Sequence, residues 1–242
     1  VVGSALAAPE LSAQRKIDGG IEYQLRRAER LMDQLNFRFA IRHLERMGKN
    51  YPKDGRVDVL RGESHFALDQ WKEAVEAYRA GLKKTPALGS RLPNYPFALV
   101  KLGEFDTAEK AYRAIFKEAK SDAERAQGTY GLGLVALFRG QTEEAIEHLE
   151  RAYSFNARSS KINYRLGLAY RTAKKPDLAL KHLDIVMKRN GLHEAAAYNV
   201  AMAWAQKRDR AKVKEWKKRH RDIRQARLRL GGLRAQLARR AG

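Results

Sequence analysis

The fold is decided by three stretches that repeat one pattern. Residues 130–145 read YGLGLVALFRGQTEEA, residues 164–179 read YRLGLAYRTAKKPDLA, and residues 198–213 read YNVAMAWAQKRDRAKV. Each stretch starts 34 residues after the one before it, with a tyrosine first, a small residue three positions later, and Ala or Val last. Self-similarity at a fixed period indicates stacked structural units. We therefore expect a repeat architecture.

The same frame extends toward the N-terminus. One position holds alanine in five successive units, and a bulky apolar residue follows it four positions later. The alanines are Ala40, Ala74, Ala108, Ala145 and Ala179, and the bulky residues are Leu44, Tyr78, Tyr112, Leu149 and Leu183. An earlier position holds Ala28, Gly62, Pro96, Gly133, Gly167 and Ala201. The spacing is 34 residues except for one step of 37, which indicates an insertion near residues 121–125.

Each unit is expected to be a pair of helices. Small residues mark where helices cross closely, and an apolar residue four positions later lies on the same face. Turn signals separate the two helices, as at Gly103-Glu104, Gly140-Gln141 and Pro176-Asp177. Pro52 and Pro86 end two of the units. No unit can bury its apolar face alone, so the core forms by stacking neighbours.

These residues resemble the tetratricopeptide-repeat (TPR) family, whose 34-residue unit has a W-x2-L-G-x2-Y…A-x3-F…P pattern. Leu166-Gly167-x-x-Tyr170 with Ala179-x3-Leu183 matches it well, and so does Gly62 with Ala74-x3-Tyr78. The tryptophan position is mostly lost, and Pro93 and Pro96 weaken the first helix of the third unit. The resemblance implies an all-α fold, a right-handed α-α superhelix of about six helical hairpins with a basic C-terminal helix.

The expected organisation has three parts. Residues 1–20 form an N-terminal tail, residues 21–206 form the repeat array, and residues 207–242 form a basic capping helix and tail. The units span about 21–54, 55–88, 89–125, 126–159 and 160–193, and residues 194–206 are the first helix of the last unit.

Composition leaves the cellular compartment open. The 242-residue chain has no cysteine and a formal net charge of +21, which favours anionic partners. The first residues, VVGSALAAP, resemble the end of a secretory signal, with Ala5-x-Ala7 as the cleavage pattern. We expect residues 1–8 to be a signal remnant of an exported, periplasmic protein; the alternative is an Ala-rich tail on a cytoplasmic one.

The resemblance implies a concave groove lined by the first helix of each unit. In this chain its lining would be Tyr130, Leu134, Phe138, Tyr164, Leu168, Arg171, Tyr198 and Met202. An extended peptide or a partner helix would lie across the tyrosines, with Arg171 and Lys161 meeting an acidic group. The alternative is that the tyrosines only pack between neighbouring first helices.

The C-terminal segment is strongly cationic. Residues 207–240 hold fifteen Lys or Arg against three acidic residues, and Trp216, Ile223, Leu230 and Leu237 recur every seven positions. We expect a capping helix that Gly231-Gly232 breaks or bends. It could also bind an anionic surface, a membrane or another polyanion, through Lys214, Lys217, Lys218, Arg221, Arg224 and Arg227. Nucleic acid is a weaker candidate, because Trp216 alone could stack on bases.

No catalytic or metal-binding pattern is present. The six histidines form no HExxH motif, and there is no phosphate-binding glycine loop and no GxSxG elbow. His43, His148 and His182 are expected at the surface of second helices. We therefore expect no enzyme activity, no cofactor, no metal and no small-molecule substrate. The expected function is that of a protein-interaction adaptor, with tethering to an anionic surface as the alternative.

Overall fold

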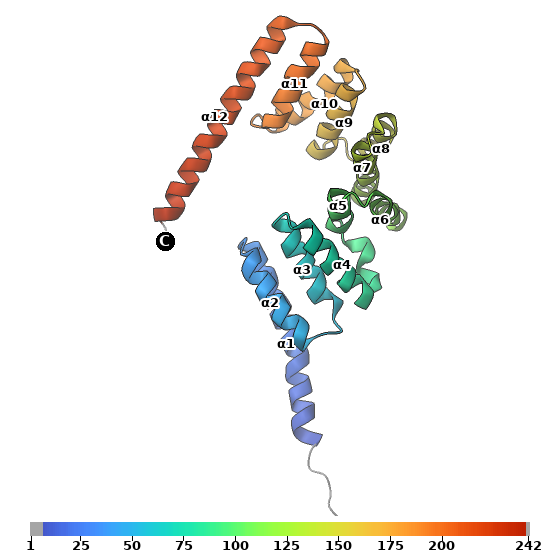
Figure 1. Cartoon of the computed structure of the whole chain (residues 1–242), viewed down its shortest axis with the longest axis vertical. Coiled ribbons are helices and arrows are strands. Elements are labelled where there is room, and N and C mark those ends of the chain that lie inside the picture. Colours follow the sequence, from blue (N-terminus) through green and yellow to red (C-terminus); the bar gives the residue numbers. More distant parts are fainter. Residues whose placement is uncertain (1–6, 241–242) are drawn as a thin grey trace, which may run out of the picture. The chain divides into compact units, whose positions relative to one another are not determined.

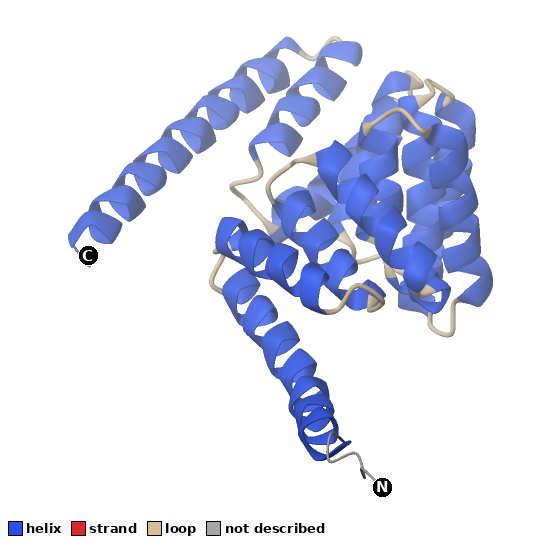
Figure 2. Cartoon of the chain, turned by 60° about the horizontal axis from the view of Figure 1, so that its bottom comes forward, coloured by secondary structure: helices blue, strands red, loops and turns tan. Residues whose placement is uncertain are grey.

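The computed structural model describes residues 7–240, without the side chains of residues 7–19, 90–91, 234 and 238–240. Over this range the chain forms twelve α-helices, one short 3-10 helix and no strand (Figure 2). The all-α fold of packed helical hairpins is therefore confirmed. The proposed signal remnant falls mostly outside the described range, since residues 1–6 are not described and Ala7 begins the first helix.

The chain divides into two units, residues 1–111 and 112–242. The first unit (Figure 1) holds α1 (Ala7–Asp33), α2 (Phe37–Asn50), α3 (Gly55–Ala67), α4 (Trp71–Lys84), the 3-10 helix η1 (Pro86–Arg91) and α5 (Asn94–Lys101). The boundary falls inside α6 (Phe105–Glu118). The second unit continues with α7 (Asp122–Phe138), α8 (Thr142–Phe155), α9 (Ser160–Thr172), α10 (Pro176–Arg189), α11 (Glu194–Gln206) and α12 (Arg210–Arg240).

The turn between the two helices of every repeat is the same. A residue with positive φ ends the first helix at six positions: Leu35, Asp69, Gly103, Gly140, Lys174 and Arg208. In each turn the next residue donates its N–H to the carbonyl five residues back, as Lys175 does to Tyr170 at 2.8 Å. This is the Schellman ending of a helix. The six positions follow the repeat spacing of the sequence, so the repeat register continues through Arg208.

The alanines and leucines of the repeat form the cores of the two units. Ala40, Ala74, Ala108, Ala145 and Ala179 are all fully buried, as are Leu44, Tyr78, Leu149 and Leu183. Small residues permit the close crossing: a β-carbon on Gly167 would lie 2.6 Å from Leu183 Cγ. Each second helix from α2 to α10 also packs against the next first helix. For example, α10 contributes Leu183, Val186 and Met187 to one cluster with Ala196, Ala197 and Val200 of α11.

Two helices begin differently from the rest. The first helix of the third repeat, α5, is only eight residues long and follows η1. Pro96 is tolerated because the N–H groups of a helix's first turn have no partner within the helix. The insertion near residues 121–125 begins α7, where Ser121 and Glu124 form a capping box.

Both terminal helices are longer than the sequence indicated. Helix α1 begins at Ala7, ahead of the expected start of the array near residue 21. The expectation that Gly231-Gly232 breaks the last helix is wrong, because α12 continues to Arg240 (Figure 1). Glycine weakens a helix by about 1 kcal/mol relative to alanine, and the surrounding Arg, Leu, Ala and Gln residues favour the helix.

Candidate functional site

Three tyrosines occupy equivalent places on the first helices of the second unit. Tyr130 of α7 and Tyr164 of α9 are half-buried and pack against the hydrophobic clusters of the unit. Tyr198 of α11 is 47% exposed. The packing interpretation therefore describes the first two rings, whereas the third presents much of its surface to solvent.

The rest of the predicted groove is unevenly exposed. Phe138 is 45% exposed, Leu168 and Met202 are half-buried, and Lys161 is exposed. Leu134 is fully buried. The expectation that Leu134 contacts a partner is therefore corrected, since it offers no surface, while its helix neighbour Phe138 does.

Two histidines support the tyrosine rings. The ring of Tyr164 lies 5.0 Å from that of His193, whose Nδ1 accepts the N–H of Ala196 at 3.1 Å and caps α11. The ring of Tyr198 lies 5.7 Å from His220 on α12. Each ring therefore contacts a histidine of the repeat that follows or of the next helix: His193 precedes α11, and His220 lies on α12.

Arg171 combines burial with an unused donor. Its Nε is buried and has no hydrogen-bond acceptor among the described residues. The carbonyl of Arg171 accepts the side-chain amide of Gln206 at 2.9 Å, which joins α9 to the end of α11. A buried donor without an acceptor is unfavourable, so the Nε of Arg171 is destabilising where it lies.

The expected surface position of three histidines is partly wrong. His43 and His182 are buried, whereas His148 is partly exposed, 3.8 Å from Glu144. His182 Nδ1 lies 2.9 Å from Asn163 Oδ1, and its ring stacks on Tyr170 at 5.6 Å. Burial, with the nearby Lys181, lowers the pKa of His182. All three histidines follow a repeat alanine by three residues, which places each on the face of that alanine. The burial of His43 and His182 therefore depends on the residues packed around them.

Helix α12 is the second helix of a complete sixth repeat. It lies beside α11 in Figure 1, and Trp216 and Ile223 join the cluster that α10 and α11 form. Glu194 of α11 accepts a hydrogen bond from Arg227 at 3.3 Å, and its Oε1 lies 3.7 Å from His220 Nε2. The sixth repeat therefore does not end with a first helix at residue 206, as the sequence suggested, but includes the start of α12.

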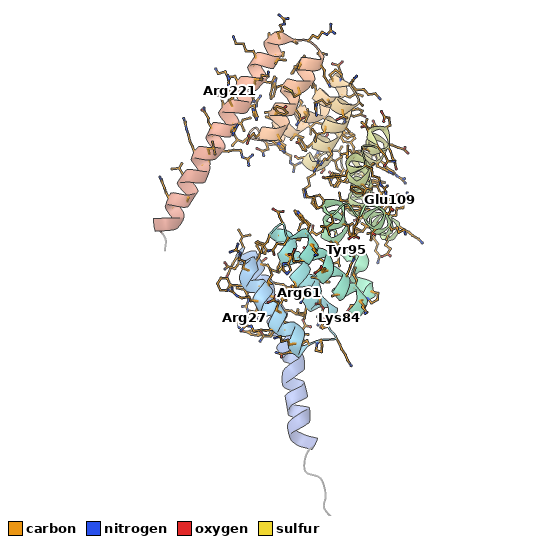
Figure 3. All side chains as sticks on the ribbon, in the orientation of Figure 1. Arg27, Arg61, Lys84, Tyr95, Glu109 and Arg221 are labelled. Atoms are coloured by element: carbon orange, nitrogen blue, oxygen red, sulfur yellow. The ribbon has the colours of Figure 1, made fainter. Side chains whose placement is uncertain are left out.

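The cations of α12 fall into separate groups. Lys214, Lys217 and Arg221 gather around an open hollow of about 680 Å³, together with Arg208, Arg210, Ala205 and Val213. Arg221 extends from α12 in Figure 3. The other predicted cations do not line this hollow: Lys218 and Arg224 are exposed elsewhere, and Arg227 pairs with Glu194. Sequence reasoning missed Arg208 and Arg210, which the turn before α12 brings to the same place.

The far half of α12 extends beyond its contacts with α11. Leu230, Leu233 and Leu237 are 45%, 55% and 64% exposed. They continue the face that carries Trp216 and Ile223, because residues three, four and seven apart share one side of a helix. Leu230 also borders an open hollow of about 550 Å³ with Leu192, His193 and Arg227.

Two further features of the described residues bear on the class of site. Within the described residues, no three His, Asp or Glu side chains are grouped as metal ligands would be. None of the described helices is long and apolar enough to cross a bilayer.

The helical hairpins, their common turn and the small residues that recur at the repeat spacing define a helical repeat protein. A family model described as tetratricopeptide repeat matches residues 25–88 and 98–160, just over half of the chain. The chain belongs to the tetratricopeptide-repeat family.

Three solved structures with this fold have low sequence identity to the chain. The type IV pilus biogenesis factor PilW has a TM-score of 0.72 and 16% identity, over 81% of this chain and 89% of that one. PilF of Pseudomonas aeruginosa has a TM-score of 0.71 and 15% identity, over 90% and 98%. YrrB, described as a TPR protein with an unusual peptide-binding site, has a TM-score of 0.53 and 18% identity, over 74% and 91%. No curated protein matches the chain. At these identities the similarity concerns the fold alone.

Proposed function

We propose that this chain is a protein-binding scaffold that holds a peptide or helix of a partner along the first helices α7, α9 and α11. The observation that carries the proposal is the aromatic surface of these helices, where Tyr198 is 47% exposed and Phe138 is 45% exposed. Large, stiff aromatic rings dominate binding energy at protein interfaces.

The charges near these rings favour an acidic segment in the partner. Lys161 is exposed and Arg171 is half-buried on α9, and neither forms an ion pair with another described residue. A carboxylate can accept two hydrogen bonds from one guanidinium. The fold relative YrrB, described as having a peptide-binding site, supports this mode without defining the residues here.

Site-specific photocrosslinking tests the proposal in cells of the source organism. A benzophenone amino acid at Tyr198 is compared with the same group at Tyr23, which is 52% exposed on α1 and outside the proposed surface. We expect a discrete crosslinked partner from position 198 and none from position 23. With the identified partner, Tyr198→Ala and Phe138→Ala together should weaken binding by at least about tenfold, as loss of an interface hot spot does. Equal crosslinking from both positions would contradict the proposal.

A second candidate function is a tether to an anionic surface through the far half of α12. The exposed Leu230, Leu233 and Leu237 support it, because an amphipathic helix binds lipid through apolar residues flanked by cations. Flotation with phosphatidylglycerol vesicles tests it. Replacing the three leucines by Gln should abolish flotation, while Leu228→Gln, at a 69% exposed position off this stripe, should not. Flotation unchanged in the triple variant would rule out the leucine stripe as the tether.

A further inference from the structure

The second helix of each repeat has a face that receives the next first helix. On α10 this face consists of Leu180, Leu183, Val186 and Met187, which pack against Ala196, Ala197 and Val200 of α11. On α8 the corresponding Leu149 and Ala152 share a cluster with Ile162 and Leu166 of α9. In both cases an apolar helix face lies against the next helix, in the same repeat register.

The same register on α12 gives a different chemistry. The positive-φ residues Lys174 and Arg208 fix the correspondence, so Leu180, Leu183 and Met187 of α10 correspond to Lys214, Lys217 and Arg221 of α12. Val186 corresponds to His220, which is already engaged with Glu194 and Tyr198. The place where a seventh repeat would pack is therefore lined by cations.

These cations are not paired with the acidic residues beside them in the sequence, Asp209, Glu215 and Asp222. Lys214, Lys217 and Arg221, with Arg208 and Arg210, surround the hollow of about 680 Å³ whose floor is Ala205 and Val213. None of the five side chains forms an ion pair with another described residue. We call these five residues and their floor the cationic end face. Like charges around one hollow repel one another, and their potential is lowered when an anionic group enters.

We propose that the cationic end face binds an acidic amphipathic helix of a partner protein, in the place that the first helix of a seventh repeat would take. The repeat register indicates that the partner is a helix, because the corresponding faces of α8 and α10 each pack against a helix. The charge supplies the chemistry, because an apolar helix would bury lysines and arginines without partners, whereas carboxylates one turn apart would pair with them. The site is distinct from the tyrosines of α7, α9 and α11.

Other occupants fit the face less well. A second copy stacking head to tail would bring its α1, where the exposed Glu22, Glu29 and Asp33 are interspersed with Arg26, Arg27 and Arg30 (Arg27 is labelled in Figure 3), so this helix offers no uniformly acidic face. The hollow is lined by no aromatic ring on which a base could stack. Its apolar floor, Ala205 and Val213, is too small to insert into a bilayer.

Fluorescence anisotropy with synthetic peptides tests the proposal on the full chain. The probe is a labelled 21-residue helix with Glu along one face and Leu and Ala along the other. Two matched peptides replace every Glu by Gln, or keep the composition but contain two central prolines that prevent a helix. We expect the acidic helix to bind at least tenfold more tightly than either peptide.

Charge-reversal variants locate the site. Lys214→Glu, Lys217→Glu and Arg221→Glu together should weaken binding of the acidic helix at least tenfold. The control variant, Lys218→Glu, Arg224→Glu and Arg229→Glu, changes the net charge equally at exposed positions outside the hollow and should weaken it less than threefold. Circular dichroism confirms that both variants keep their helix content.

Several results would overturn the proposal. If both charge-reversal variants lost the same binding affinity for the acidic helix, the effect would come from overall charge and not from this site. If the proline-containing peptide bound as tightly as the acidic helix, the ligand would not need to be helical. Tighter binding of an RNA oligonucleotide or of phosphatidylglycerol vesicles than of the acidic helix, lost only in the Lys214, Lys217 and Arg221 variant, would assign the face to those ligands instead.

Discussion

Helices α10 and α12 are the second helices of adjacent repeats and differ in one face. Both follow the same Schellman turn, and both pack against their own first helix. On α10, Leu183 and Met187 are buried under α11, whereas Lys217 and Arg221 at the matching positions of α12 face an open hollow. The difference shows that the turn and the inner face define a repeat, while the outer face can carry either apolar residues that receive a helix or cations that line a hollow.

Of the predicted changes, removing the contact of Leu183 should lower the free energy of unfolding most. Leu183→Ala leaves a cavity between α9, α10 and α11, and loss of a fully buried leucine lowers the free energy of unfolding by about 2–5 kcal/mol. Lys217→Ala, at the matching exposed position, should change it by less than about 0.5 kcal/mol. Urea unfolding followed by circular dichroism measures both. Similar losses in the two variants would show that α12 is covered as α10 is.

Replacing Gly167 by alanine should lower stability, whereas replacing Gly231 by alanine should raise it. Gly167→Ala places a β-carbon 2.6 Å from Leu183 Cγ, so it should lower the free energy of unfolding by about 1–3 kcal/mol through overpacking. Nothing described lies within 4 Å of a β-carbon added at Gly231. Gly231→Ala should therefore stabilise the far half of α12 by up to about 1 kcal/mol. Hydrogen exchange of the amides near residue 231 reads out this local gain, and faster exchange would contradict it.

Acid should lower the stability of the chain through His182 of α10. Trp216 occupies the corresponding position of α12 and does not titrate. Burial lowers the folded-state pKa of His182 below its ordinary 6.5. The unfolded chain therefore binds a proton more readily, so stability is complete above about pH 6.5 and declines as the pH falls toward the folded-state pKa. His182→Asn should remove part of this decline. Urea midpoints of both proteins between pH 5 and pH 8 test it, and parallel curves would argue against His182.

The smallest effect should come from the ion pairs that hold α12 to α11. Glu194 lies 3.7 Å from His220 and 3.3 Å from Arg227, at the protein surface. Glu194→Gln should lower the free energy of unfolding by less than about 1 kcal/mol, and the loss should shrink further in high salt. A larger, salt-independent loss would mean that packing of Glu194, instead of its charge, holds the helix.

The sequence predicted the inner structure of the repeats well, because that structure depends on residue size. The five alanines that recur in the repeats, Ala40 to Ala179, are all fully buried. The short helix α5 occurs where Pro93 and Pro96 indicated a weak helix. The resemblance to the repeat family is likewise confirmed. These features depend on contacts that recur in every unit, so the repeats reinforce one another in the sequence.

The candidate sites were harder to predict, because they depend on contacts made in one unit only. His182 is buried by Asn163 and Tyr170, neither of which is close to it in sequence. The register of α12 was hard to recognise in the sequence, because Lys217 occupies the position at which α8 and α10 have a leucine. Leu134 shares its helical face with Tyr130, but only the structure shows that it is buried.

The six identical turns have a consequence for how the length of this chain can change. Removing residues 175–208 would join Lys174, at a positive-φ position, to Asp209, which follows one. The new junction would have the same backbone path and the same closing hydrogen bond as the old one. Duplication or loss of a whole unit at these turns would therefore keep the backbone path of the turn on which the remaining units depend.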